Sequence, residues 1–297
     1  MRIGCSPAYA FAHFAEHLTY EDLVWSARRV AELGFCGLQL ETYNREQKDL
    51  YAGGQVVAIR ELFQDLGLEI SQFNVHSLKS ELTSLDRARR IAGIEAFKEL
   101  VEIATKLGQV DVICLPASPP PELIAEYYET YPGAIQPVLS IPSDLSWQRI
   151  WDTYAETLRR CLDITIDAGM KLAIEGVPFG VISNTDSFLR LAETIGSDSL
   201  GFNLDTGHIF VQKEDLAVAI EKLGSRLLGT HICDNDGCVD DHWVPGRGKI
   251  DWRAVLGALQ KVGYAGPLDI EINICEDPDQ DYLEGKRFLE AILKELE

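Results

Sequence analysis

The sequence predicts a single-domain α/β protein spanning residues 1–297 and folded as a (β/α)8 TIM barrel. Three observations support this fold class. A helical segment, a glycine and a short apolar run recur in that order seven times, and the opening run RIGCS adds an eighth strand. A chain of 297 residues is long enough for one barrel domain. An open doubly wound sheet is disfavoured because neither a GxGxxG turn after the first strand nor a GxxxxGK[ST] loop occurs.

The repeated joint between helix and strand identifies the strands in order. The seven apolar runs read FCGLQLE, LEISQF, QVDVICL, MKLAIEG, SDSLGFNLD, SRLLGTHIC and YAGPLDIEI. Each run follows a glycine, where we expect the preceding helix to end in the left-handed conformation that costs glycine no Cβ clash. These glycines are Gly34, Gly67, Gly108, Gly169, Gly196, Gly224 and Gly263.

The segments between the runs carry the period of amphipathic helices. In residues 19–33 the apolar Leu23, Ala27 and Val30 recur at spacings of three and four, and Thr19 with Asp22 resembles a capping box. The other helices are expected at about 54–66, 84–107, 146–168, 185–195, 213–223, 251–262 and 280–296. Strand and helix therefore alternate as a barrel requires.

The longest connection, at about 116–147, follows the fourth strand. It is rich in proline and aromatic residues, so we expect an ordered flap over the barrel mouth rather than a linker. Trp147 and Trp151 lie near the end of this connection. If exposed, these two side chains would form a subunit contact of a homo-oligomer or close over a substrate, and packing in the core is the alternative.

Composition narrows the classes of partner. The formal net charge of −20 disfavours nucleic acid, because a field of that sign repels a phosphate backbone. No apolar run approaches the ~20 residues of a membrane span and the N-terminus lacks signal-peptide features, so we expect a soluble cytoplasmic protein without a membrane partner. The seven cysteines include no CxxC pair and are expected to be reduced and structural.

Four ligand-type residues close the predicted strands five to eight. Glu175, Asp205, His231 and Glu271 stand at or near the carboxyl ends of their runs, where a barrel places its active site. Three carboxylates brought together there would repel one another without a cation or bound protons. Three hard oxygen ligands and one imidazole, with no thiolate, predict one divalent ion: manganese, magnesium, cobalt or zinc.

Two further histidines follow strand ends. His208 stands three residues after Asp205 and is expected to donate a hydrogen bond to a substrate hydroxyl beside the metal, with a capping or core role as the alternative. His76 ends the third strand and so points toward the same mouth, where it serves either substrate contact or structure.

In combination, five segments resemble the xylose-isomerase-like barrel superfamily, and within it the sugar and sugar-phosphate isomerase/epimerase branch. They are LAIEG around Glu175, DTGH from Asp205, HICDNDG from His231, VPGRGKIDW and IEIN around Glu271. The resemblance spans nearly the whole chain. It implies that the four strand-end residues bind one divalent ion, that Glu175 and Glu271 are also the catalytic acid/base pair, and that His208 contacts substrate.

The chain departs from its relatives in the loop after strand seven. His242 stands where ketose 3-epimerases carry a sugar-binding arginine, so His242, Asp240 and Arg247 become candidates for substrate binding. Asp240 and His242 also echo an Asp-x-His that completes a three-zinc cluster in the abasic-site endonucleases. The strand-four histidine of that cluster is replaced here by Leu115, which argues against a full cluster.

The leading functional hypothesis is a metal-dependent epimerase or isomerase of a small sugar, polyol ketone or sugar phosphate, which abstracts a proton next to a carbonyl and passes through an enediolate. An inosose-type dehydratase would use the same site. An abasic-site endonuclease and a non-catalytic sugar-binding barrel are the rivals from other classes. Only Arg247 and Lys249 could bind phosphate after strand seven, and the strand-eight loop is acidic, so an unphosphorylated substrate is favoured.

Overall fold

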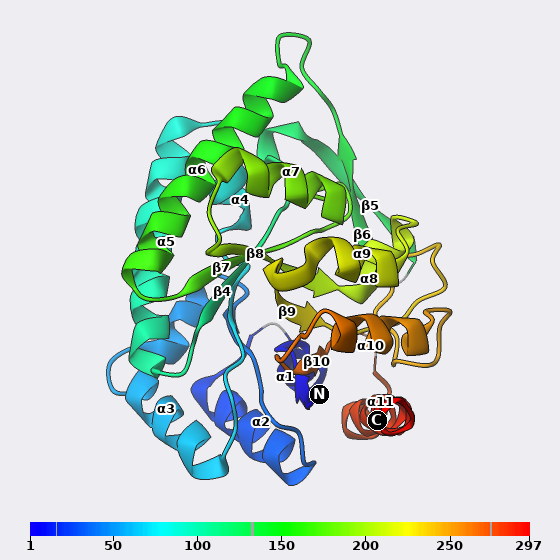
Figure 1. The fold of residues 1–297 in the computed structure, drawn as a ribbon. Helices are drawn as coiled ribbons and strands as arrows, with labels where there is room; N and C mark the ends of the chain where they lie inside the picture. Colours follow the sequence, from blue (N-terminus) through cyan, green and yellow to red (C-terminus); the bar gives the residue numbers. More distant parts are fainter. Residues whose placement is uncertain (16, 132–133, 274) are drawn as a thin grey trace.

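A computed structural model describes residues 1–15, 17–131, 134–273 and 275–297 of the chain. Within these ranges the central strands are all parallel, and helices surround them (Figure 1). The central strands are β1 (Ile3–Cys5), β2 (Leu40–Thr42), β3 (Phe73–Val75), β4 (Val112–Pro116), β7 (Lys171–Glu175), β8 (Leu200–Asp205), β9 (Leu227–His231) and β10 (Leu268–Ile270). The fold is the TIM barrel that the alternating pattern predicts, so that prediction is confirmed.

The strands close into a ring. Six of them pair in the order β2-β3-β4-β7-β8-β9, and β1 pairs with β10. Single parallel bridges join these two groups, from Cys5 to Leu38 on one side and from Ile232 to Ile270 on the other. Because every strand runs the same way, all carboxyl ends open at one mouth.

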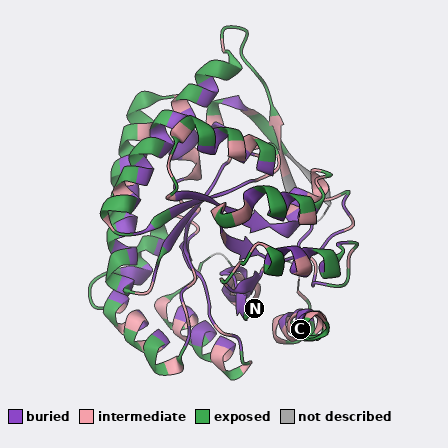
Figure 2. Ribbon diagram, in the orientation of Figure 1, coloured by how far each residue is buried: buried purple, intermediate pink, exposed green. Residues whose placement is uncertain are grey.

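Long helices separate consecutive strands at nearly the expected positions. They are α2 (Tyr20–Glu32), α3 (Gln55–Leu66), α5 (Arg87–Leu107), α6 (Trp147–Asp167), α7 (Thr185–Ile195), α9 (Leu216–Leu223), α10 (Trp252–Lys261) and α11 (Pro278–Leu296). The capping box at the start of α2 is confirmed, since Thr19 and Asp22 bond reciprocally. Figure 2 shows buried strands at the centre and helices whose outer faces are exposed.

Three short helices, α1 (Ala8–Phe14), α4 (Lys79–Thr83) and α8 (Thr206–Val211), follow strands β1, β3 and β8 and were not predicted. At five to seven residues they are too short to show helical periodicity in the sequence. Each lies directly after a strand end, so these turns help to build the mouth of the barrel.

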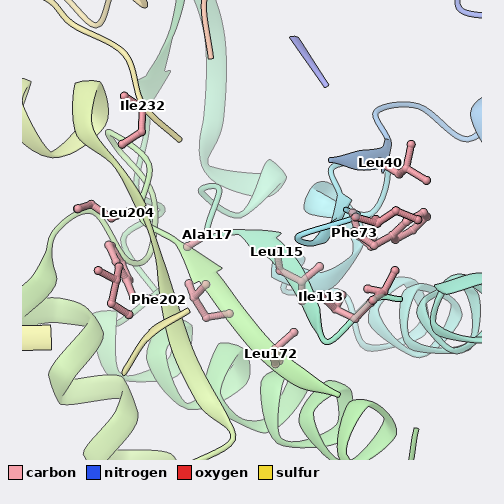
Figure 3. Packing of buried hydrophobic residues seen from close by; sticks show 14 of the residues in the cluster. Leu40, Phe73, Ile113, Leu115, Ala117, Leu172, Phe202, Leu204 and Ile232 are labelled. Atoms are coloured by element: carbon pink, nitrogen blue, oxygen red, sulfur yellow. The ribbon is translucent and has the colours of Figure 1, made fainter. Parts of the chain in front are cut away.

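The core lies between the strands and the helices. Phe73, Ile113, Leu172 and Phe202, from four neighbouring strands, are fully buried and are seen packing there in Figure 3. Trp151 on α6 is also buried, at 3% exposure, so core packing is the alternative that holds for this side chain. Arg190 lies over its ring instead, which leaves only Trp147 of the pair exposed.

The connection between β4 and α6 contains an antiparallel pair, β5 (Ile124–Tyr131) and β6 (Ala134–Leu139), preceded by the short turn η2 (Pro121–Leu123). Figure 1 shows this hairpin standing beside the barrel. None of the helices that the structure describes is both long and apolar enough to traverse a bilayer. The seven cysteines are free thiols, as expected.

The glycine joints follow the expected conformation with one exception. Gly34, Gly67, Gly108, Gly169, Gly196 and Gly263 have φ between 66° and 76°. Gly224 also has a positive φ, 51°, but its ψ of −126° lies outside the left-handed helical region. The reason is local: Gly224 begins a 3-10 turn, η3 (Gly224–Arg226), that carries the chain into β9.

The positive φ at these joints predicts opposite effects of one substitution at two glycines. An added Cβ meets no atom within 4 Å at either Gly67 or Gly257, but Gly67 has φ +66° and Gly257 lies inside α10. Gly67→Ala should therefore destabilise the fold by about 1 kcal/mol. Gly257→Ala should stabilise it by about 0.5 to 1 kcal/mol. Urea unfolding measures both, and equal effects of the two changes would contradict the account.

Candidate metal centre

Four consecutive barrel strands deliver one ligand-type side chain each to the mouth. Glu175 ends β7, Asp205 ends β8, His231 ends β9, and Glu271 directly follows β10. The register aligns them, because Asp205 pairs with His231, and Glu271 donates its backbone N–H to Ile232 O at 3.0 Å. These are the residues singled out from the sequence, and the structure brings all four together.

The four side chains form a compact set of donors. One ligand atom from each lies within 4.8 Å of all the others. His231 Nδ1 contacts Glu175 Oε1 closely and lies 3.3 Å from Glu271 Oε2. Asp205 Oδ1 caps α8 through the backbone N–H of His208 at 2.9 Å, whereas its buried Oδ2 accepts no hydrogen bond. A buried carboxylate oxygen without a donor, beside two more carboxylates and an imidazole, fits a divalent cation.

The pKa values of these groups reveal how much negative charge is gathered there. Burial raises the pKa of Glu271 to about 7, against the pull of His231 and His242. Burial also disfavours the charged form of Glu175, but His231 outweighs it and holds the pKa of this carboxyl well below its usual range. Burial works against a charged His231 as well, yet Glu271 and Glu175 raise its pKa to about 10. The buried carboxylates are therefore stabilised in their charged form only by positive charge close to them.

A layer of buried amides underlies the centre. Asn203 on β8 donates to Glu175 Oε1 at 3.1 Å and accepts from Gln72 at 2.8 Å. On the other side, Gln39 Oε1 lies 2.9 Å from His231 Nε2. All three side chains are at most 1% exposed. Asn203 and Gln39 contact ligand-type side chains directly, and partners of this kind orient metal ligands, whereas Gln72 bonds to Asn203. Sequence reasoning missed them, because amides within apolar strands carry no recognisable spacing.

Three more histidines surround the four residues. His76 Nε2 lies 3.6 Å from Glu175 Oε2, and its Nδ1 is 2.8 Å from Glu41 Oε2. The burial of His76 favours its neutral form, but Glu175 and Glu41 raise its pKa to about 9. Glu41, at the end of β2, was not singled out from the sequence, although it stands at a strand end as the other acids do.

His208 and His242 meet edge to face with ring centroids 5.2 Å apart. His208 Nε2 lies 3.4 Å from Asp240 Oδ2, and His242 Nδ1 lies 3.5 Å from Glu271 Oε2. Ligand atoms of Asp205, His208 and His242 also lie within 4.8 Å of one another, so this group too has the spacing of a cation site. Two of its three members, His208 and His242, are residues that the sequence assigned to substrate contact, and the third, Asp205, belongs to the first group as well.

An open cavity of about 570 Å³ lies above the centre. Glu41, His76, Glu175, His208, Asp240, His242 and Glu271 supply its polar lining. Its apolar wall includes Phe11 after β1, Tyr127 on the β5–β6 hairpin and Phe179 after β7. Lys79 is the one lysine or arginine among its described lining residues, and its Nζ lies 5.5 Å from the centre of the Tyr43 ring. The volume suits a ligand of a few to a few tens of heavy atoms.

Arg247 does not reach this cavity. Its guanidinium pairs with Asp281 at 2.7 Å and with Glu284 at 2.6 Å, both on α11. Lys249, the other cation expected after strand seven, is exposed and is not part of the lining either. The loop after β9 therefore brings His242 and Asp240 to the site but turns its cationic side chains away.

One buried aspartate explains much of the motif VPGRGKIDW. Asp234 Oδ1 accepts the backbone N–H groups of Asn235 and Ile250, at 2.9 and 3.2 Å. Its Oδ2 accepts the N–H of Gly246 at 2.9 Å and Trp252 Nε1 at 2.8 Å. Asp234 also forms a two-way backbone bridge with Trp243, next to His242. A carboxylate with both oxygens hydrogen-bonded thus holds the loop that carries His242 over the candidate metal ligands.

Comparison with known proteins places the chain in a described family. A model of the xylose isomerase-like TIM barrel matches residues 27–292. Fructoselysine 3-epimerase of Escherichia coli O157:H7 is 31% identical over 126 residues, which are 41% of this chain and 46% of that protein. L-ribulose 3-epimerase of Mesorhizobium japonicum is 23% identical over 272 residues, covering 88% of this chain and 82% of that one.

Solved structures share the fold. The structure titled L-ribulose 3-epimerase superposes with a TM-score of 0.78 at 18% identity, covering 99% of this chain and 96% of the other. The chain spans only about half the length of some curated relatives. At these identities the structural likeness shows the fold, and activity has to be argued from the site.

The four donors to Asp234 predict that it is essential to this loop. Asp234→Asn leaves one oxygen, so two N–H groups would face an amide NH2, and the fold should lose about 2 kcal/mol. Hydrogen exchange should accelerate across residues 235–250. Asp236→Asn is the matched control, because Asp236 is only half-buried in the same loop and its described hydrogen bonds, from Cys238 and Val239, both go to Oδ1. Equal losses in the two variants would contradict the role of Asp234.

Proposed function

The chain belongs to the xylose isomerase-like TIM barrel family, and we propose that it is a divalent-metal-dependent epimerase or isomerase of a small sugar or polyol ketone. The observation that carries the proposal is the convergence of Glu175, Asp205, His231 and Glu271, with ligand atoms within 4.8 Å of one another, where Glu175 and Glu271 line the cavity. Two of the four are glutamates that can also exchange protons with a bound molecule.

The metal would be held by these four side chains. When bound, a divalent ion supplies Lewis acidity that stabilises negative charge developing on a carbonyl oxygen. Ligand type admits manganese, magnesium, cobalt or zinc. A solved structural neighbour is described as IOLI protein with a binding zinc atom, which supports a metal in a protein of this fold but does not select the ion for this chain.

The chemistry proposed for the chain's own residues is proton transfer next to a carbonyl. Glu175 and Glu271 stand on β7 and directly after β10, so they approach a bound ketone from different sides of the mouth. One carboxylate removes a proton from the carbon beside the carbonyl, and the enediolate is protonated again. Return to the same carbon from the opposite face inverts it, whereas return to the neighbouring carbon isomerises the substrate.

The remaining polar lining would orient the substrate's hydroxyl groups. His208, His242, Asp240 and His76 surround the two glutamates and offer both donors and acceptors. Phe11, Tyr127 and Phe179 would cover the apolar faces of a sugar carbon chain and limit the access of water. Curated relatives named for action on fructoselysine, L-ribulose and inosose support a polyhydroxylated carbonyl compound as the substrate class.

The test is a panel of ketoses, ketose phosphates and inososes incubated with manganese-loaded enzyme in deuterated water. We expect deuterium at a carbon-bound position next to the carbonyl of at least one ketone. Incorporation with retained hydroxyls means epimerisation or isomerisation, and loss of a hydroxyl means the dehydratase reaction. Binding of a sugar without any exchange would contradict catalysis and favour the sugar-binding rival.

Removing one proton-transfer group should abolish turnover. Glu271→Gln keeps the size of the side chain but cannot accept the proton, so kcat should fall by at least ~100-fold. Glu276→Gln is the control, because Glu276 is exposed in the following loop and does not line the cavity. More than a few per cent of activity remaining in Glu271→Gln would remove this residue from the mechanism.

Metal stoichiometry separates this proposal from a phosphodiesterase. Leu115 is a buried core residue at 3% exposure and offers no ligand on β4. We therefore expect elemental analysis to find one tightly bound divalent ion per chain after dialysis. Two or three tightly bound ions per chain would indicate that Asp205, His208 and His242 also bind metal. That result would favour the hydrolytic alternative.

The placement of Arg247 favours a substrate without phosphate. Its charge is already paired on α11, which leaves Lys79 as the one lysine or arginine of the described cavity lining. Turnover of a ketose should therefore exceed that of its terminal phosphate at least tenfold, about 1.4 kcal/mol in kcat/KM. A preference for the phosphate that disappears in Lys79→Met would contradict this and identify Lys79 as its binding residue.

A further inference from the structure

The two ring nitrogens of His231 face different surroundings. Nδ1 points into the cluster of carboxylates, in close contact with Glu175 and 3.3 Å from Glu271. Nε2 points down into the barrel, 2.9 Å from Gln39 Oε1. A metal binds the neutral imidazole, in which one nitrogen carries a proton and the other a lone pair. In that form the cation takes the place of a proton between Nδ1 and the carboxylates, so the partner of Nε2 decides whether Nδ1 can bind it.

The orientation of the Gln39 amide is determined by its other partners. Its Nε2 donates to Asp269 Oδ2 at 2.8 Å, and its Oε1 accepts from Asn74 Nδ2 at 2.7 Å. If the amide were turned over, its oxygen would face the Asp269 carboxylate and its NH2 would face the amide donor of Asn74. Both contacts would then be repulsive. Asp269 is itself held by Ser71, which donates to the same oxygen at 2.7 Å.

A second amide lies near the same ring nitrogen and would favour the opposite proton position. Gln72 Nε2 is 3.4 Å from His231 Nε2 and could donate only to a lone pair there. This contact is longer than the 2.9 Å from Gln39 Oε1, and Gln72 Nε2 already donates to Asn203 at 2.8 Å. A lone pair on Nε2 would face the Gln39 carbonyl oxygen at close range, so the shorter contact determines the assignment.

We propose that Gln39 is a positioning residue that keeps the proton of His231 on Nε2 and thereby reserves Nδ1 for the metal. Asp269, Gln39 and His231 form one continuous chain of hydrogen bonds. Asp269 accepts from the Gln39 amide, the Gln39 carbonyl accepts from Nε2–H of His231, and Nδ1 retains its lone pair. Gln39, Asn74, Asp269 and His231 are each at most 1% exposed, so water does not compete for these bonds.

This inference rests on the metal of the proposed function but not on the reaction. Its consequence is that Gln39, which directly precedes β2 and is not itself a ligand, sets the affinity of the centre. Partners of this kind change metal affinity by about 10- to 100-fold when they are removed. The probe is Mn²⁺ alone, titrated against a competing chelator, so that no substrate or turnover is needed.

Gln39→Leu is the test and Gln72→Leu is its matched control. Each replaces one buried amide of the same layer by a side chain of similar size. We expect the dissociation constant for Mn²⁺ to rise by about 10- to 100-fold in Gln39→Leu and by less than about threefold in Gln72→Leu. The reverse order would mean that Nε2 carries the lone pair and would overturn the proposal, as would unchanged affinity in a folded Gln39→Leu.

A double variant keeps the proposal testable if Gln39→Leu does not fold. In Gln39→Glu with Asp269→Asn, the new amide donates to the new carboxylate, whose second oxygen still accepts from His231. Mn²⁺ affinity should remain within about threefold of wild type, whereas Gln39→Glu alone places two buried carboxylates together and should lose it. Loss of affinity in a folded double variant would contradict the role assigned to Gln39.

A spectroscopic readout addresses the proton directly. In the zinc-loaded protein with ¹⁵N-labelled histidine, the proton of His231 should reside on Nε2, and a proton on Nδ1 would refute the assignment. Failure of wild-type protein to bind Mn²⁺ or zinc would instead count against the metal of the proposed function. The two failures are therefore distinguishable.

Discussion

The structure depends on how a buried group of like charges is compensated. Glu175, Asp205 and Glu271 bring three carboxylates to one point of the barrel mouth, and Asp205 Oδ2 has no hydrogen-bond donor there. Two such charges at 4 Å repel by about 4 kcal/mol at an effective dielectric constant of 20. The imidazoles of His231, His76 and His208, whose pKa values are raised, lie beside these carboxylates, and under the proposed function the same negative charge would attract a divalent cation. The carboxylates that would bind the cation are thus the same groups whose repulsion its charge would offset.

Different strands and loops of the barrel supply different parts of this charged site. β7, β8, β9 and the start of the loop after β10 carry the ligand-type residues, while Gln39, directly before β2, and Asn203 on β8 are buried amides that contact them. The loops add the rest: Asp234 holds the chain that presents His242, and the β5–β6 hairpin supplies Tyr127 to the apolar wall. A single mouth therefore combines a floor of charged side chains on the barrel strands with walls supplied by the loops.

The sequence predicted two kinds of feature: patterns that recur along the chain, and ligand-type residues at the ends of apolar runs. The repeated glycine joints predict the barrel, and charged residues ending apolar runs predict which strands supply ligands. Gln39, Gln72 and Asn203 could not be found in this way, because their role follows from which strands become neighbours across the ring. Arg247 was expected at the substrate because it lies in the right loop, but Asp281 and Glu284 from a helix far along the chain pair with it instead. Pairings of that kind depend on tertiary contacts that local pattern does not encode.

The central claim, that this charged cluster is a metal site, is tested most directly by thermal unfolding with and without Mn²⁺, for wild type and Asp205→Asn. A ligand at 100 times its dissociation constant stabilises the native state by about 2.7 kcal/mol, which for a domain of this size raises Tm by roughly 5 °C. The account predicts a rise of this order in the wild-type protein and little or none in Asp205→Asn. A wild-type Tm that does not respond to Mn²⁺, Mg²⁺, Co²⁺ or Zn²⁺, or an equal rise in the two proteins, would contradict it.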